Sequence, residues 1–194
     1  MRVYCQNVNG LQLDALGGDF TAMCQVASEI HADFVCITEH NLDSTKHRIK
    51  QLCFDSLHRT LPRSKLTIGS SPIQTQGDYK PGGTLIIARG SLTARFKTSG
   101  ADELGRWTFQ SYSAKDSRHV TIVSAYQVCQ KNHSQRGRYT AAAQQESLLR
   151  QRNVSDPNPR KHFRKDISKF LQSLIQKQHD IIMVGDFNEA LGDD

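Results

Sequence analysis

The sequence predicts an α/β sandwich in which helices cover β-sheets, and two observations lead to it. Helical periodicity alternates with short apolar runs towards both ends of the chain, and consecutive short strands with tight turns occupy residues 66–127. This order, βα-βα followed by many strands and then α-β, is typical of layered α/β and α+β folds. At 194 residues the chain suits one domain with a substantial core, expected to span residues 1–194.

The first third of the chain is predicted to form two strand–helix units. Residues 2–6 and 33–38 are apolar enough for strands. An amphipathic helix is expected between them, because apolar residues recur at helical spacing. Its apolar face contains Phe20, Met23, Cys24, Ala27 and Ile30. A second helix is expected from about residue 44, opened by Ser44 or Thr45.

The rest of the chain is predicted to change from strands back to helix and strand. Short strands are expected at 66–68, 84–88, 92–96, 107–112 and 120–125. The polar residues 130–160 indicate a surface loop that contains a short helix near residues 141–150. A longer amphipathic helix at about 163–175 then leads to a last strand at 181–184.

Composition favours an anionic partner. The net charge of +6 points first to nucleic acid, although many ordinary domains are mildly basic without such a partner. The 37% hydrophobic and 23% charged residues are typical of a folded domain and not of a disordered chain. No apolar run approaches the roughly 18 residues of a membrane span, and no signal peptide is recognised. The five cysteines are scattered without a C-x-x-C pair, so we expect reduced thiols in a nuclear or cytoplasmic protein, with no inferable protein partner.

Three polar motifs directly follow runs that are predicted to be buried strands. They are Asn7-Val8-Asn9-Gly10, Glu39, and Gly185-Asp186-Phe187-Asn188. Strand ends of α/β folds collect ligand groups, because the strands hold side chains rigidly while the loops leave them open. An asparagine, a glutamate and an aspartate at neighbouring strand ends would form an oxygen-rich pocket. Such a pocket suits a hard divalent cation and a phosphate.

Each motif alone also has a structural interpretation. Glu39 could be a solvated loop carboxylate, and Asn7 and Asn9 could serve an ordinary turn. An aspartate placed like Asp186 can orient or deprotonate water, and an amide such as that of Asn188 can hold a phosphate oxygen. Tyr126, which ends the strand at 120–125, could be a core residue. The order of all these residues together favours the functional interpretation.

In that order, the motifs resemble the endonuclease/exonuclease/phosphatase superfamily, whose members include DNase I, abasic-site nucleases and the endonuclease domains of non-LTR retrotransposons. The resemblance rests on the N-x-N-G motif at residues 7–10, Thr38-Glu39, Tyr126 at a strand end and the G-D-F-N motif at 185–188. It covers practically the whole chain. The stretches 82–87 and 104–107 resemble the retroelement branch in particular.

The resemblance implies a DNase I-like fold of two mixed β-sheets covered by helices, and a Mg²⁺-dependent site, with Mn²⁺ as an alternative cation. Glu39 and Asn7 would hold the metal, and Asp186 would align the attacking water. Asn188 and Tyr126 would bind the scissile phosphate, and Asn7 and Asn9 would contribute to substrate binding. Asp186, Asn188 and Tyr126 would form the catalytic set.

The sequence departs from the family pattern at its C-terminal end. The family closes with further strands and a Ser-Asp-His motif, whereas all eight histidines here precede the G-D-F-N motif. His40 is a poor substitute, because adjacent strand residues point to opposite faces. We therefore expect a C-terminally truncated fold that lacks the last strands, with weak or no cleavage of DNA.

Three functions remain open at this point. The first is a metal-dependent endonuclease of retroelement type, supported by basic clusters at residues 46–50 and 160–165. The second is a phosphatase that acts on a phosphoinositide or another small phosphoester. The third is a non-catalytic remnant that binds nucleic acid.

Overall fold

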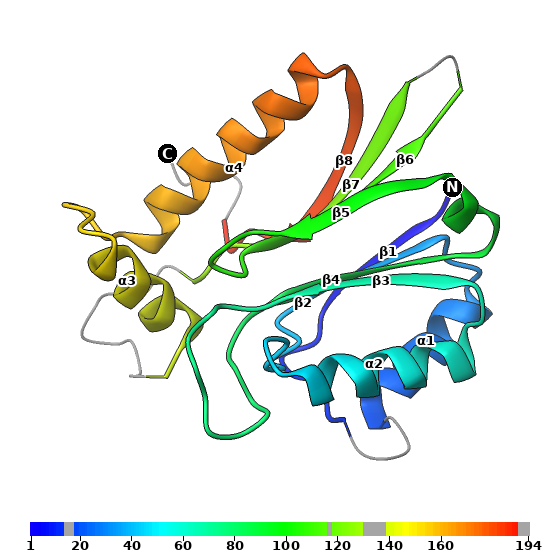
Figure 1. Cartoon of the computed structure of the whole chain (residues 1–194), viewed down its shortest axis with the longest axis horizontal. Helices are drawn as coiled ribbons and strands as arrows, with labels where there is room; N and C mark the ends of the chain where they lie inside the picture. Colours follow the sequence, from blue (N-terminus) through cyan, green and yellow to red (C-terminus); the bar gives the residue numbers. More distant parts are fainter. Residues whose placement is uncertain (14–17, 116–117, 130–138, 190–194) are drawn as a thin grey trace.

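The computed structural model describes residues 1–13, 18–115, 118–129 and 139–189. Two four-stranded sheets pack face to face, and helices cover their outer faces (Figure 1). The spatial order of the first sheet is β1 (Val3–Asn7), β2 (Phe34–Thr38), β4 (Thr84–Arg89) and β3 (Ser64–Gly69). Its β1–β2 pair is parallel and its other pairs are antiparallel, so this sheet is mixed.

The second sheet repeats this mixed arrangement. Its order is β5 (Phe96–Ala101), β6 (Trp107–Ser113), β7 (His119–Tyr126) and β8 (His179–Asp186). The β7–β8 pair is parallel, whereas the other two pairs are antiparallel. The predicted sandwich of two mixed sheets is confirmed.

Alternation along the strands divides the core into layers. In β2, Phe34 and Cys36 face the second sheet, where Tyr112 and Ile122 meet them. Val35 and Ile37 point the other way and join the cluster beneath α1 (Gly18–Glu29) and α2 (His47–Thr60). Because β2 is covered on both faces, all five of its residues are buried.

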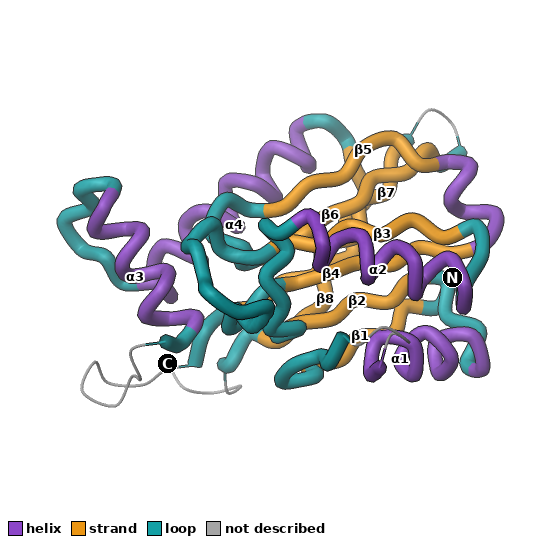
Figure 2. Tube along the Cα trace, turned by 60° about the horizontal axis from the view of Figure 1, so that its bottom comes forward, coloured by secondary structure: helices purple, strands orange, loops and turns teal. Residues whose placement is uncertain are grey.

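The outer face of the second sheet is covered by α4 (Pro159–Gln176). Phe163 and Ile167 of this helix pack against Trp107 and Val123. The shorter helix α3 (Ala141–Gln151) lies beyond the end of the sheets. Figure 2 shows the connecting loops gathered at this same end, where β1, β2 and β8 reach their C-terminal residues.

Three local predictions need correction. Residues 90–95 form a 3₁₀ helix, η1 (Gly90–Arg95), so the strand expected at 92–96 begins only at Phe96. Helix α2 begins at His47 instead of near residue 44. Ser44 and Thr45 are instead used in a turn, where the Asp43 carboxylate accepts hydrogen bonds from the backbone and hydroxyl of Thr45.

The first and last strands are also less buried than predicted. Cys5 and Gln6 of β1 are exposed, and Met183 of β8 is 37% exposed. The reason is topological, since among the described strands β1 pairs only with β2 and β8 pairs only with β7. Both strands are therefore edge strands, although Val3, Ile182 and Val184 still pack against the core between the sheets.

Within the described part of the chain, no helix is both long and apolar enough to cross a membrane.

Candidate active site

The polar motifs of the first and last strands meet across the two sheets. The amide nitrogen of Asn7, at the end of β1, donates to Glu39 Oε1 at 3.0 Å and to Asp186 Oδ2 at 2.7 Å. One side chain thus bridges a carboxylate beyond β2 and a carboxylate at the end of β8. The Oδ1 atom of Asn7 accepts a hydrogen bond from the backbone N–H of Asn9 at 3.0 Å, which fixes the orientation of the amide.

A glycine allows the last strand to bring Asp186 into this position. Gly185 has φ +153°, and a Cβ there would lie 1.8 Å from the carbonyl oxygen of Ala125. Any side chain would therefore push β8 away from β7. The close pairing sets Asp186 opposite Tyr126 in the parallel register and lets Gln127 N–H donate to the Asp186 carbonyl at 2.9 Å.

Backbone in the left-handed region surrounds the two carboxylates. Asn9, Asn41 and Asn188 adopt positive φ, as asparagine does readily in turns. Glu39 also has φ +53°, a conformation that costs a residue of its type roughly 1–2 kcal/mol. Hydrogen bonds from Glu39 N–H to the Gly83 carbonyl and from Gly10 N–H to the Glu39 carbonyl hold it there. Such strain at a strand end is characteristic of functional sites.

Tyr126 forms a wall of the site. Its side chain is 5% exposed, so it is a buried residue, whereas the strand-end position alone was compatible with a rim. Burial raises the pKa of Tyr126, and the Glu39 carboxylate, to which its hydroxyl is hydrogen-bonded, raises it further. The phenol therefore stays protonated and acts as a hydrogen-bond donor at neutral pH.

Asn188 lies beside the carboxylates, but its amide is already engaged. Its backbone N–H donates to Asp186 Oδ1 at 3.0 Å, which closes an Asx-type turn. The side-chain nitrogen donates to the Gln127 carbonyl at 2.7 Å, and the side-chain oxygen accepts from the Cys129 thiol at 3.3 Å. Of the predicted residues, Asn7, Glu39, Asp186 and Tyr126 come together directly, whereas Asn188 is turned towards its own loop.

The donor set fits a hard divalent cation. Two carboxylates converge there and offer oxygen, whereas the Asn7 amide presents its N–H group to them and would offer its oxygen only if the bond from Asn9 N–H broke. In the structure the Asn7 N–H group lies between the two carboxylates, where positive charge is favoured. Mg²⁺ needs only one or two protein carboxylates, because water and substrate phosphate complete its coordination. Among the described residues, no group of three or more His, Cys, Asp or Glu side chains could hold a metal.

His40, the residue next to Glu39, serves the fold. It is fully buried, its Nε2 atom lies 3.0 Å from the Gly69 carbonyl, and its Nδ1 atom accepts from Leu42 N–H at 3.0 Å. Burial lowers its pKa to about 4, which keeps the imidazole neutral. The expectation that it does not replace the family histidine agrees with this geometry.

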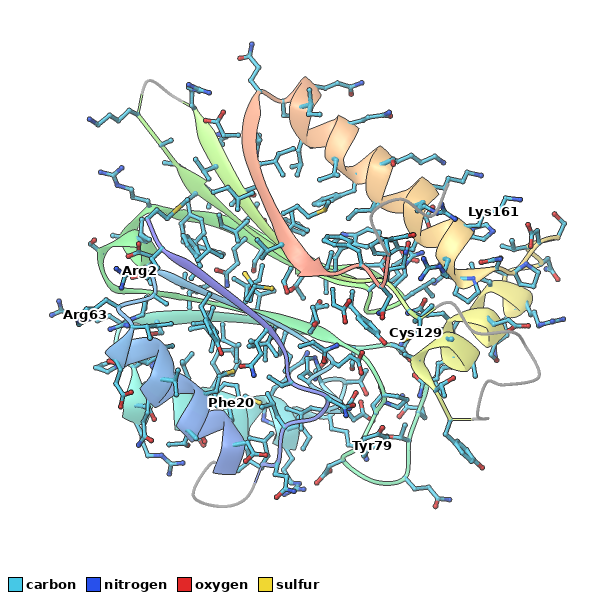
Figure 3. All side chains as sticks on the ribbon, turned by 180° about the vertical axis from the view of Figure 1, so that it is seen from behind. Arg2, Phe20, Arg63, Tyr79, Cys129 and Lys161 are labelled. Carbon is cyan, nitrogen blue, oxygen red and sulfur yellow. The ribbon has the colours of Figure 1, made fainter. Side chains whose placement is uncertain are left out.

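A cavity of about 380 Å³ lies beside Glu39. Glu39 and Tyr126 are both part of its lining. Its further lining includes residues that the sequence interpretation missed, namely Asn41, Tyr79, Val128, Cys129, Tyr139 and Ala141. Tyr79 and Cys129 come from separate segments at the same end of the molecule (Figure 3). One sequence signal was present, because an aromatic residue stands at position 79 within a polar, turn-rich segment.

Comparison with solved structures identifies the fold. AP endonuclease LMAP from Leishmania major matches with a TM-score of 0.61 at 18% identity, over 98% of this chain and 56% of that one. The 3′ phosphatase NExo from Neisseria, bound to a product DNA hairpin, gives 0.58 at 15% identity, over 100% and 60%. The human Nocturnin catalytic domain, with bound sulfate, gives 0.53 at 17% identity, over 97% and 65%.

The chain has the DNase I-like fold. These neighbours belong to the endonuclease/exonuclease/phosphatase superfamily, and at 15–18% identity the likeness shows the fold alone. The chain spans between 56% and 65% of their length. No family model matches the sequence, and no curated protein matches it.

Proposed function

We propose that this protein is a metal-dependent phosphodiesterase that cleaves nucleic acid, with DNA as the preferred substrate. The single observation that carries the proposal is the convergence of Glu39 and Asp186 on the amide of Asn7. Nothing in the packing of the core requires two carboxylates to meet at the ends of strands from different sheets. They meet at the loop-rich end, where Glu39 lines a cavity. Convergent charged groups beside a cavity are the arrangement expected of a site that binds and cleaves a phosphodiester.

Each residue has a role in this chemistry. Glu39 and Asn7 would hold Mg²⁺ or Mn²⁺, which when bound supplies positive charge to the phosphate in the transition state. The Asp186 carboxylate would orient the attacking water and accept its proton. Tyr126, kept protonated by burial, would donate a hydrogen bond to a phosphate oxygen in place of the one it now gives to the Glu39 carboxylate. Asn188 can do so only if its bond to the Gln127 carbonyl breaks.

We further propose that hydrolysis by residues 1–194 is slow. The departing oxygen needs a proton, and none of the described histidines forms a hydrogen bond to Asn7, Glu39 or Asp186. His40 is enclosed, and His119 and His179 lie at the opposite end of β7 and β8 from Tyr126 and Asp186. Absence of a general acid typically costs about 10²–10⁴ in rate.

The two basic clusters differ in how many of their side chains are engaged in contacts within the protein. In the first, Lys46 donates to the carbonyls of Gln76 and Gly77, and Arg48 pairs with Asp78, so this cluster anchors a loop. In the second, Arg160 is buried and pairs with Glu189, and Lys161 pairs with Asp156. Lys165, and Lys169 one turn beyond the cluster, are exposed on α4 and form no ion pair with any described residue. Figure 3 shows Lys161 of the same helix on its outer side. We propose that α4 contributes the surface that attracts the DNA backbone.

The retroelement origin remains a proposal from sequence. Of the residues that suggested it, Arg106 forms ion pairs with Asp102 at 2.7 Å and Asp166 at 2.9 Å and so fastens β6 to α4. Gly83 makes room for His40, since a Cβ there would lie 2.4 Å from its Nε2 atom. Both residues stabilise the fold, so they give no information about the substrate.

The test is Mg²⁺-dependent nicking of supercoiled plasmid, together with hydrolysis of bis(p-nitrophenyl) phosphate. We expect slow cleavage that EDTA abolishes, and a fall of about 10²–10⁴-fold in Asp186→Asn and Glu39→Gln. Asp55→Asn, which changes an exposed aspartate on α2, is the matched control and should cleave like wild type. Metal-independent cleavage, or cleavage that survives both site substitutions, would refute the proposal.

The two alternatives give different outcomes in the same assays. A non-catalytic remnant would bind DNA without nicking it or hydrolysing the small diester. A small-phosphoester phosphatase would release phosphate from an inositol phosphate while leaving plasmid intact.

A further inference from the structure

Two tyrosine rings project into solvent at the mouth of the cavity beside the carboxylates. Tyr79 is 62% exposed and Tyr139 is 82% exposed, and both line the cavity. They come from segments far apart in sequence, the connection between β3 and β4 and the residues that precede α3. Exposed aromatic rings are costly in water and are enriched where proteins bind other molecules.

The backbone on both sides of Tyr79 is firmly held. Tyr79 itself forms an antiparallel bridge with Leu42. The next residue, Lys80, is fully buried, and its ammonium group lies 2.6 Å from the Asp43 carboxylate and donates to the Ser71 carbonyl at 2.7 Å. Lys80 N–H also donates to the Asn41 carbonyl at 2.8 Å. A ring on so rigid a support is pre-organised for contact and loses little entropy on binding.

The segment of Tyr139 is fastened to that of Tyr79. Tyr139 immediately precedes Thr140, which caps α3 by accepting from Ala143 N–H at 3.2 Å. The hydroxyl of Ser71 donates to Gln144 of α3 at 2.7 Å. Helix α3 also packs so closely on the other segment that a Cβ on Gly82 would lie 3.0 Å from Ala141 Cβ. The segments that carry the two rings are therefore held together by direct contacts.

The cavity that Tyr79 and Tyr139 line suits a flat, uncharged group. Its volume of about 380 Å³ lies in the range of roughly 300–1,000 Å³ that is usual for ligand pockets. The walls are small or apolar at Pro81, Gly82 and Ala142. The exposed side chain of Asn9 offers both a donor and an acceptor. Among the described lining residues, Glu39 is the one charged group, which disfavours an anionic group in this space.

We propose that this cavity binds an unpaired nucleobase, stacked against Tyr79 and Tyr139, while the adjoining phosphate lies at the carboxylates. The inference rests on the proposed function and makes the preferred substrate a single strand, an end or a displaced base. Stacking on aromatic rings tolerates any base, because every base has a π face. Asn9 would then contact the base edge.

Binding of a single-stranded oligonucleotide that carries one 2-aminopurine, measured by fluorescence in EDTA, tests the inference without cleavage. We expect quenching on binding, and affinities about 5- to 100-fold weaker for Tyr79→Ala and Tyr139→Ala. Tyr79→Phe and Tyr139→Phe keep the ring and should bind like wild type. Both positions are exposed, so the substitutions spare the core. As an unlabelled competitor, an oligonucleotide that is abasic at every position should displace the 2-aminopurine strand from wild type far less well than an intact oligonucleotide of the same length.

The outcomes separate this inference from the proposed function. Unchanged binding by both alanine variants, equal competition by the abasic and intact oligonucleotides, or displacement of DNA by inositol phosphate would overturn base stacking. The proposed function is judged by hydrolysis of bis(p-nitrophenyl) phosphate, which has no nucleobase. Stacking without hydrolysis would sustain the inference and refute the phosphodiesterase. Hydrolysis with no effect of the tyrosine variants on binding would do the reverse.

Discussion

The side-chain nitrogen of Asn7 donates to the Asp186 carboxylate at 2.7 Å, which joins positions 179 residues apart in sequence. This bond connects the last residue of β1 in one sheet with the last residue of β8 in the other. Because the same nitrogen also contacts Glu39, the amide keeps two carboxylates close that would otherwise repel each other. The site therefore depends on the alignment of the two sheets.

Replacement of Asn7 by alanine should reduce metal-dependent cleavage by about 10- to 100-fold, the usual cost of removing a group that orients metal-binding side chains. The carboxylates of Glu39 and Asp186 would lose their shared donor and separate. The measurement is the Mg²⁺ dependence of plasmid nicking. Gln6→Ala, which changes the exposed neighbour on β1, should leave it unaltered. An equal response of the two variants would show that the bridge has no part in the site.

Charge reversal on α4 should weaken DNA binding more than the same reversal elsewhere. Affinity falls as salt rises, and the double variant Lys165→Glu with Lys169→Glu should make this dependence weaker. The negative slope of log affinity against log salt should decrease in magnitude by about 2, since each lysine contributes about 1. Lys50→Glu with Arg59→Glu on α2 causes the same change in net charge and is the matched control. The titration of a labelled duplex at several salt concentrations distinguishes them. Equal slopes would mean that total charge, and not the α4 surface, attracts DNA.

The sandwich was predictable because the apolar residues of most segments recur at the spacing of the helix or strand that the segment forms. In β2 the unbroken apolar run reflects a strand covered on both faces, and α4 shows its buried face through Phe163 and Ile167. The run 92–96 was misleading, because Leu92 packs towards the core from a 3₁₀ helix and its apolar character resembles that of a strand. The exposure of Cys5 could not be predicted, since it depends on which strands lack a neighbour.

The candidate site was predictable only in part. Asn7, Glu39 and Asp186 follow strands directly, so their meeting could be expected from strand order. Tyr79 lies in a long connection whose course is set by the buried contacts of Lys80, and no local pattern indicates where such a loop turns. The side chain of Asn188 likewise follows a contact with Gln127 that only the β7–β8 register determines.

The ion pair beneath Tyr79 should contribute strongly to stability. Asp43 and Lys80 are both fully buried and lie 2.6 Å apart, and Asp43 also accepts from the hydroxyl of Thr75 at 2.8 Å. Lys80→Met leaves a buried carboxylate without its cation, and loss of one partner of such a pair costs about 3–5 kcal/mol. Urea unfolding of Lys80→Met, Asp43→Asn and the double variant forms a double-mutant cycle. The loss of unfolding free energy in the double variant should be far smaller than the sum of the losses in the two single variants. If the losses add, the two charges do not interact.

The same pair predicts how stability depends on acid. Burial raises the pKa of Asp43, but hydrogen bonds from Lys80, Thr45 and Thr75 outweigh burial and lower it to about 2, from an ordinary value of 3.8. The unfolded chain therefore takes up this proton at higher pH than the folded protein, so the stabilisation is complete only well above the unfolded pKa of 3.8 and is lost as the pH falls towards 2. Urea midpoints measured across this range should fall more steeply for wild type than for Asp43→Asn, which has no proton to gain at this position. Parallel curves for the two proteins would show that the Asp43 carboxylate is not held in its charged form by the folded structure.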